Sequence, residues 1–177
     1  MQNTAEKKER AVLAGLAAAS MEPRERSTDV SMQELAALVE TAGGEVVGYV
    51  VSVTSGDGVE GDITLSVGLS ADGTVTGIAF TELNETPGMG SLCGEPAFKD
   101  QFLGVKTDWF VLSGSGTVVE GTSETTGTAD SGQSIPITTG STAAIDGVTG
   151  ATKSSRAVVN AINAALDFFR SYQKGGM

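Results

Sequence analysis

The chain has 177 residues, of which 40% are hydrophobic and only 5% aromatic, and its formal net charge at pH 7 is −11. This length fits a single domain with a hydrophobic core. Residues 27–177 carry 18 acidic and six basic side chains. A body this acidic argues against nucleic acid as a partner and against a face that lies on anionic lipid.

The residue types that the sequence lacks narrow the chemistry further. There is no histidine and only one cysteine, Cys93. A histidine-based catalytic triad, an intrachain disulfide, a structural zinc site and an iron–sulfur cluster are therefore excluded. We expect Cys93 to be a small buried apolar side chain rather than a reactive thiol. Any redox chemistry would depend on an organic cofactor.

The first 45 residues are predicted to form a helical segment. Residues 5–19 would form a helix with Val12, Leu13 and Leu16 on one side. The basic start and short apolar run of this stretch resemble a signal peptide, but its acidic residues favour a helix that begins the domain. No apolar run approaches the ~18–20 residues that a membrane-spanning helix needs.

A second helix is predicted to begin at Ser31, which forms a capping box with Glu34. The glycine pair at Gly43 and Gly44 would end it. Its apolar face would consist of four side chains: Met32, Leu35, Leu38 and Val39.

After this helix the hydrophobic period changes to two, which indicates strands. Residues 46–53 are almost entirely apolar, as in a central strand, and residues 62–70 alternate between apolar and polar side chains. A third strand follows within residues 71–80, after a tight turn at Asp72 and Gly73. Three consecutive strands with this turn predict an antiparallel meander.

The second half is predicted to contain a short helix at Phe98–Phe102, a strand at Trp109–Leu112 and a long surface loop over residues 113–144. Within the loop only Ile135–Thr138 is strand-like. An amphipathic helix is predicted over residues 153–172, because apolar side chains recur there every three or four residues. We therefore predict an α+β fold, an antiparallel sheet packed with helices. Its single domain would span residues 46–172, and residues 173–177 would be a tail.

The turn before this last helix has the sequence "DGVTGATKSS". Gly150 has no side chain, so another group can approach the backbone closely, and the helix N-terminus attracts anions, phosphate above all. Lys153 and Arg156 in the first turn are unfavourable for an isolated helix, by ~0.3–1 kcal/mol each, which suggests a negative partner. The spacing supports equally well a simple threonine cap with two solvated cations.

The same ten residues resemble the flavinylation motif of the FMN-binding domain family, which includes the G subunit of the Rnf complex and the C subunit of the sodium-translocating NADH:quinone reductase. The motif reads Asp, two variable residues, Ser or Thr, Gly, Ala, Thr, one variable residue, and Ser or Thr. The matching residues are Asp146, Thr149, Gly150, Ala151, Thr152 and Ser154. The resemblance implies that Thr152 carries FMN through a phosphodiester bond.

A second, distant stretch also resembles the family. "NETPGMGS" is similar to the Glu-Thr-Pro-Gly-Leu-Gly loop that lies against the flavin ring in the family, with Met89 in place of leucine, a volume-conserving change. The resemblance thus spans roughly residues 46–172. The loop residues expected near the ring are Glu85, Thr86, Gly88 and Met89, and Pro87 and Gly90 complete the match.

The resemblance also implies roles for the residues around Thr152. Thr149 is expected to cap the helix and contact the phosphate, and Asp146 to position or be recognised by the modifying enzyme, unless it merely forms the turn. Gly150, Ala151, Lys153 and Ser154 complete the expected FMN-binding set; no catalytic residue and no metal ligand is expected. A threonine hydroxyl is a weak nucleophile unless a base activates it, and this chain has no histidine to serve, so self-flavinylation is not expected. The family instead uses a separate magnesium-dependent flavin transferase that consumes FAD and releases AMP.

The implied function is electron transfer within a membrane-bound, ion-translocating oxidoreductase, with its other subunits as partners and no soluble substrate of its own. Family members have an N-terminal transmembrane helix and an extracytoplasmic flavin domain. We expect this sequence to begin after that helix, with Met1 added, and to be soluble and without flavin where no transferase acts. Two alternatives remain: an extracellular binding module rich in Gly, Ser and Thr that binds no flavin, and a protein that holds FMN noncovalently.

Overall fold

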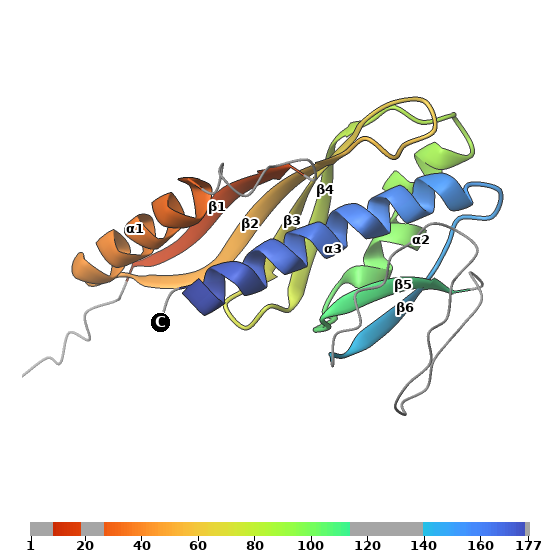
Figure 1. The fold of residues 1–177 in the computed structure, drawn as a ribbon. Coiled ribbons are helices and arrows are strands. Elements are labelled where there is room, and N and C mark those ends of the chain that lie inside the picture. Colours follow the sequence, from red (N-terminus) through yellow and green to blue (C-terminus); the bar gives the residue numbers. More distant parts are fainter. Residues whose placement is uncertain (1–8, 19–26, 114–139, 176–177) are drawn as a thin grey trace, which may run out of the picture.

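The computed structural model describes residues 9–18, 27–113 and 140–175 (Figure 1). Its main element is a four-stranded sheet with the order β1-β2-β3-β4. The strands are β1 (Arg10–Ala18), β2 (Glu45–Ser55), β3 (Ile63–Ser70) and β4 (Val75–Leu83). Strands β2, β3 and β4 pair antiparallel and form the predicted meander. The predicted α+β fold is confirmed, with the difference that β1 joins this sheet parallel to β2.

Strand β1 corrects the helix predicted over residues 5–19, because residues 10–18 pair with β2 along their whole length. Leu13 is buried whereas its neighbour Val12 is exposed, as the period of a strand requires. A Cβ on Gly15 would meet the sulfur of Met32, so a glycine lets the following helix pack closely on β1. Tertiary pairing here overrides the helical preference of an Ala- and Leu-rich stretch. Residues 5–8 and 19 of the predicted helix lie outside the described residues. The predicted boundary between the N-terminal segment and the domain, at residues 45–46, stays a prediction.

Helix α1 (Ser27–Thr41) connects β1 to β2. It begins four residues before the predicted start, so Ser31 lies inside the helix and not at its cap. The predicted end is confirmed, because Gly43 has φ +79° and its N–H donates to the carbonyl of Glu40. The predicted apolar face is only partly correct: Met32 is buried, with Ala36 packed in the same cluster, whereas Leu35 and Leu38 are exposed.

A second, two-stranded sheet consists of β5 (Trp109–Ser113) and β6 (Thr142–Asp146), which pair parallel. β5 confirms the predicted strand, whereas β6 shortens the predicted loop over residues 113–144. Residues 114–139, with the strand-like stretch Ile135–Thr138, lie outside the described residues. Between the sheets the chain forms the short helices η2 (Gly90–Gly94), α2 (Pro96–Lys99) and η3 (Asp100–Phe102), close to the predicted short helix.

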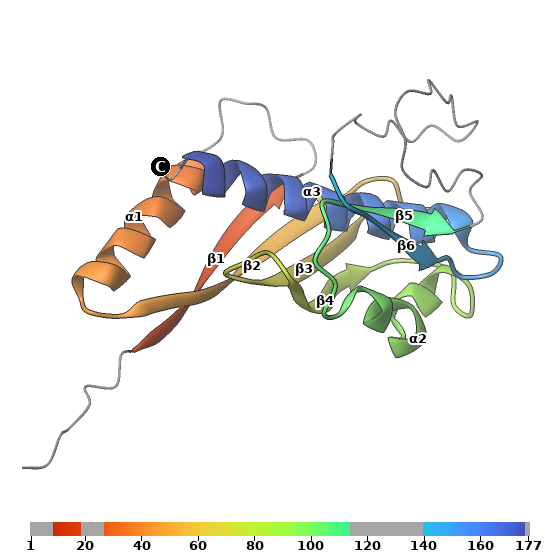
Figure 2. The same cartoon turned by 90° about the horizontal axis from the view of Figure 1, so that it is seen from below.

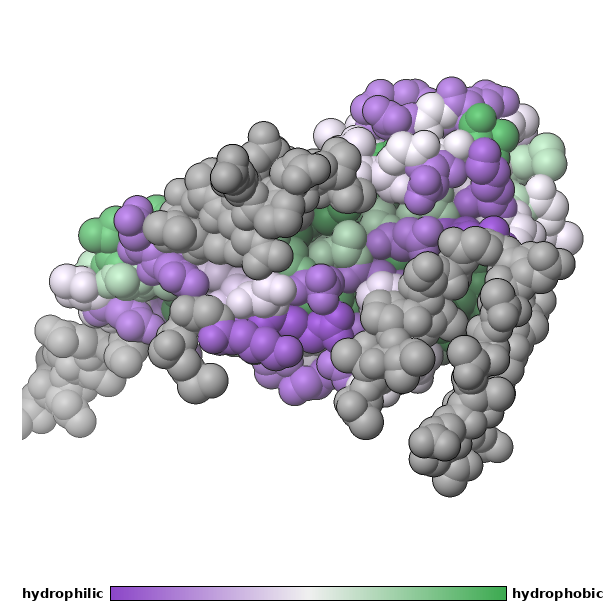
Figure 3. All heavy atoms as spheres, in the orientation of Figure 1, coloured by the Kyte–Doolittle hydropathy of each residue, from purple (hydrophilic) through white to green (hydrophobic). Residues whose placement is uncertain are grey.

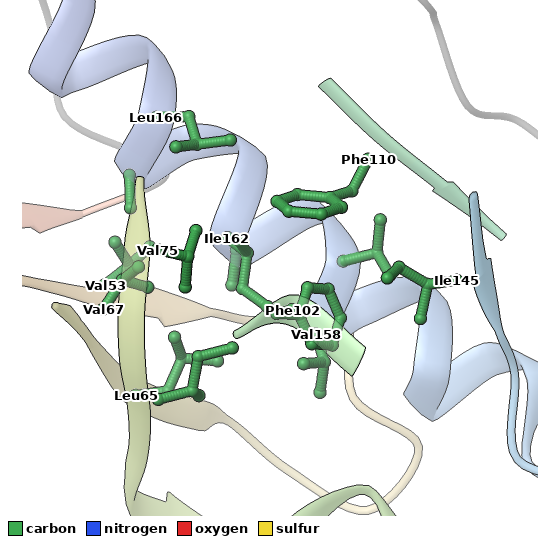
Figure 4. Close-up of a cluster of buried hydrophobic side chains, with 14 of the residues drawn as sticks. Val53, Leu65, Val67, Val75, Phe102, Phe110, Ile145, Val158, Ile162 and Leu166 are labelled. Carbon is green, nitrogen blue, oxygen red and sulfur yellow. The ribbon is translucent and has the colours of Figure 1, made fainter. Parts of the chain in front are cut away.

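The long helix α3 (Thr152–Gly175) confirms the predicted C-terminal helix. It lies across one face of the four-stranded sheet and beside β5 and β6 (Figures 1 and 2). In Figure 4 the side chain of Ile162 lies between Val75 of the sheet and Phe102, and Val158 lies next to Phe102. Within the described parts of the chain, no helix is both long enough and apolar enough to cross a membrane.

Two side-chain amides bond the outer edges of the small sheet. Asn163 of α3 accepts the N–H of Phe110 at 2.8 Å and donates to its carbonyl at 2.9 Å. Gln101 of η3 accepts the N–H of Asp146 at 2.8 Å and donates to its carbonyl at 3.2 Å. Each amide makes the backbone hydrogen bonds that a further strand would otherwise make on that edge. The bonds of Gln101 also fix the backbone of Asp146, the first residue of the sequence "DGVTGATKSS".

We expect Asn163→Ala to lower the free energy of unfolding by about 2–5 kcal/mol, because it leaves the buried N–H and C=O of Phe110 without partners. Gln173→Ala is the matched control, since Gln173 also lies on α3 and donates to a carbonyl, that of Ala71, but at the surface. The control should cost less than about 1 kcal/mol. Urea denaturation of both variants checks this; equal costs would show that the buried amide does not support β5.

Candidate functional site

Two sequence motifs that lie far apart in the chain meet at the N-terminus of α3. The β2–β3 loop, the loop after β4 and the start of α3 all lie at one end of the molecule, at the right in Figure 1. Ser154 of α3 donates a hydrogen bond to Glu85 at 2.8 Å. A Cβ on Gly150 would lie 3.8 Å from the terminal methyl of Met89. The structure thus brings together the two stretches that the sequence analysis paired.

The turn before α3 is held by backbone bonds and by Ser155. Gly150 has φ +79°, and the N–H of Ala151 donates to the carbonyl of Val148 at 3.0 Å. The buried hydroxyl of Ser155 accepts the N–H of Val148 at 3.0 Å and donates to the carbonyl of Ala151 at 2.9 Å. The predicted capping role of Thr149 is therefore wrong: Ser155, which the sequence analysis did not single out, makes the turn's side-chain bonds.

Thr149 and Thr152 both expose their side chains, and neither hydroxyl has a hydrogen-bond partner among the described residues. Thr152 is the first residue of α3, where the helix N–H groups and the positive end of the dipole are concentrated. Its hydroxyl is thus accessible to a reagent from solvent and lies where a phosphate group would be stabilised. Lys153 is also exposed.

A surface pocket of about 360 Å³ lies beside this helix start. It is lined by Leu112, Ser113, Gly147, Val148, Thr149, Thr152 and Arg156. Both threonines of the motif and one cation therefore face the same hollow. Of the two cations proposed as phosphate partners, Arg156 lines this pocket and Lys153 does not.

The loop after β4 is fixed at several points. The buried carboxylate of Glu85 accepts the N–H of Val59 at 2.7 Å with its second oxygen. Thr86 donates to Glu60 at 2.6 Å. Gly88 has φ +75°, and its N–H donates to the hydroxyl of Ser91 at 3.0 Å. Sequence reasoning missed Val59 and Glu60, although their glycine-rich surroundings indicated a turn.

The tip that carries this loop combines acidic and apolar surface. Figure 3 shows mostly hydrophilic side chains over the β2–β3 loop at the upper right, with a few apolar ones beside them. Met89 exposes 47% of its surface and offers a polarizable apolar contact next to Gly150. Val59 on the β2–β3 loop and Leu92 in η2 are exposed as well.

Two further residues singled out from the sequence, Asp146 and Cys93, differ in exposure. Asp146 holds its backbone against Gln101 and exposes its carboxylate. Cys93 is buried, as expected, and burial raises the pKa of its thiol. Among the residues that the structure describes, no three His, Cys, Asp or Glu side chains are grouped so that they could hold a metal ion.

The site also fits a flavin mononucleotide. The accessible hydroxyl of Thr152, the start of α3 and Arg156 suit a phosphate, and Met89 with the bare backbone of Gly150 suits an apolar ring system.

The sequence model of the FMN-binding domain family matches residues 58–167, so the chain belongs to this family. Its relatives include the G subunit of the Na(+)-translocating ferredoxin:NAD(+) oxidoreductase complex of Acetobacterium woodii, 29% identical over 152 residues, which are 84% of this chain and 63% of that protein. The G subunit of the ion-translocating oxidoreductase complex of Methanosarcina acetivorans is 35% identical over 133 residues, 75% of this chain and 56% of that protein. The C subunit of the Na(+)-translocating NADH-quinone reductase of Chlamydia pneumoniae is 34% identical over 128 residues, 66% of this chain and 37% of that protein. This chain therefore spans about six-tenths of the length of the two G subunits.

We expect Gly90→Ala to destabilise the protein by about 1–3 kcal/mol. A Cβ there would lie 2.5 Å from the Glu85 carboxylate and 2.6 Å from the Ser154 hydroxyl, at the junction of the two motifs. Gly77→Ala in β4 is the matched control, because no heavy atom lies within 4 Å of its added Cβ. The melting temperatures of the two variants, measured by thermal unfolding, are compared with that of the wild type. If both leave the melting temperature unchanged, the two loops are not packed as described.

Proposed function

We propose that the chain carries FMN covalently on Thr152 and transfers electrons as one component of a membrane-bound, ion-translocating oxidoreductase of the Rnf type. The observation that supports this most strongly is the exposed Thr152 hydroxyl at the start of α3, between two residues, Gly150 and Ser154, that lie against the loop containing Glu85 and Met89. Family membership supports FMN as the ligand. The names of the relatives support the assignment to an ion-translocating complex.

Attachment of the flavin requires a second protein. The Thr152 oxygen would form a bond to the phosphorus of the FMN half of FAD while the bond between the two phosphates breaks, AMP leaves, and the hydroxyl proton passes to a base. No described side chain accepts a hydrogen bond from the Thr152 hydroxyl, and the sequence contains no histidine. The base therefore comes from a separate flavin transferase, which reaches Thr152 from solvent.

Once attached, FMN supplies reversible electron uptake and release. The residues of this chain hold it: the N–H groups at the start of α3 and Arg156 stabilise the phosphodiester charge, and Thr149 contacts it from the same pocket. Met89, Thr86 and Gly88 provide the surface for the ring. The covalent bond prevents loss of the cofactor, which suits a domain on the extracytoplasmic side of the membrane.

Co-expression with a flavin transferase should add the mass of one FMN less one water to the intact protein. Thr152→Ala should abolish this addition because it removes the attacking oxygen. Thr142→Ala, which removes an exposed threonine of β6 outside the motif, should leave it unchanged. Intact-mass spectrometry with peptide mapping reads out both. An adduct on Thr149 or Ser154 would contradict the attachment site, flavin released by acid would indicate noncovalent binding, and absence of flavin would favour the binding module.

Of the two cations, we expect Arg156 to matter more for the phosphodiester. Arg156→Gln should slow flavin attachment several-fold and lower the fluorescence anisotropy of the bound flavin, because a charge-assisted contact worth about 1.5–3 kcal/mol before solvent screening is lost. Lys153→Gln is the matched control, since Lys153 is exposed and lies outside the pocket. Equal effects of the two substitutions, or none, would show that the helix start alone stabilises the phosphate.

A further inference from the structure

A buried hydrogen bond joins the two motifs of the site. Ser154 is 1% exposed and Glu85 is 7% exposed, and the Ser154 hydroxyl donates to one carboxylate oxygen at 2.8 Å. The other oxygen accepts the N–H of Val59 at 2.7 Å. Glu85 belongs to none of the ion pairs in the described parts of the chain. A buried carboxylate without a cation depends on such hydrogen bonds for its stability.

The side chains of Thr152 and Ser154 point in nearly opposite directions. Two residues along an α-helix correspond to a rotation of about 200° about its axis. Accordingly Thr152 is exposed whereas Ser154 is buried. The hydroxyl of Ser154 therefore faces the protein interior and not the surface on which Thr152 would carry a flavin.

The Glu85 carboxylate connects three segments that are distant in sequence: the β2–β3 loop through Val59, the loop after β4, and the first turn of α3. Gly90 leaves the space that this junction needs, because a Cβ there would lie within 2.6 Å of both side chains. Other side-chain bonds of the loop, such as those from Thr86 to Glu60 and from Gly88 to Ser91, lie at the surface. Water competes with such exposed bonds.

We propose that Glu85 and Ser154 are positioning residues and not flavin contacts. Their hydrogen bond sets where Met89 and its loop lie relative to Thr152, and so prepares the site before any flavin arrives. This inference rests on the proposed function at Thr152. It adds two residues to that site, Glu85 and Ser154, whose side chains are hydrogen-bonded to each other and not to a ligand.

The first test needs no flavin. In the apoprotein, Ser154→Ala should speed hydrogen exchange of the Val59 amide about tenfold or more, because Glu85 loses one of its partners and its loop opens more often. Ser154→Thr retains the hydroxyl and should restore slow exchange. Ser52→Ala is the matched control: it removes a hydroxyl that bonds to Ser66 on the sheet, and should leave exchange at Val59 as in the wild type.

The second test uses the flavin transferase with FAD. Ser154→Ala should reduce the rate of flavin attachment about tenfold and lower the anisotropy of the attached flavin, and Ser154→Thr should restore both. Glu85→Gln keeps the length of the side chain but replaces one acceptor oxygen with an NH2 donor. Its attachment rate and anisotropy should therefore lie between those of the wild type and Ser154→Ala, and it carries the test if Ser154→Ala does not fold.

The outcomes separate the two proposals. A wild-type chain that takes up no flavin refutes attachment at Thr152 and with it the positioning role. A flavinylated wild type refutes only the positioning role if Ser154→Ala shows wild-type Val59 exchange, attachment rate and anisotropy. The positioning role is equally refuted if Ser154→Ala alters exchange but leaves flavin attachment and anisotropy unchanged.

Discussion

Burial of the apolar side of α3 is the interaction on which the rest of the structure depends. Its side chains, among them Val158, Ile162 and Leu166, share one core cluster with side chains of the four-stranded sheet and with Phe102 and Phe110 (Figure 4). Each such side chain contributes roughly 1.5–3 kcal/mol when fully buried. Asn163 adds the polar contact that holds β5 against the same helix. Because α3 is fixed along its length, its first residue, Thr152, is fixed as well.

Three polar contacts hold the rest of the site in place around the start of α3. Ser155 shapes the turn before the helix, Ser154 connects it to Glu85, and Gln101 fixes the backbone at Asp146. None of these three polar contacts faces the pocket; they occupy the interior or the edge of the small sheet. Thr149, Thr152 and Met89 instead expose their side chains to solvent, where a ligand can reach them. In this motif of consecutive residues, some side chains therefore stabilise the turn, and others are exposed to a ligand.

Local periodicity in the sequence predicts some of these elements and not others. The meander and α3 were predictable because their apolar residues recur with a period of two or near 3.6. β1 was not predictable in this way, because its Ala- and Leu-rich sequence favours a helix, and only the pairing with β2 makes it a strand. The start of α1 and the strand β6 were missed for related reasons: a capping-box pattern occurred inside a helix, and a five-residue strand carries little periodicity.

The same limit applies within the site. The resemblance to a family named both motifs and included Thr152, Ser154 and Glu85 in the expected FMN-binding set, but it implied no contact between Ser154 and Glu85. The contact between Ser154 and Glu85 joins residues 69 positions apart, and Gln101 reaches Asp146 over 45 positions. No spacing rule in a single sequence reports such contacts, because they depend on how α3 and η3 pack in three dimensions.

A crystal structure of the flavin-loaded protein tests the central claim most directly. The account predicts continuous electron density from the Thr152 oxygen to the phosphate, with the phosphate at the start of α3 and the ring against Met89. Glu85 and Ser154 should keep their present hydrogen bond. Density that joins the flavin to another residue, or a ring bound away from the Glu85–Gly90 loop, would contradict it.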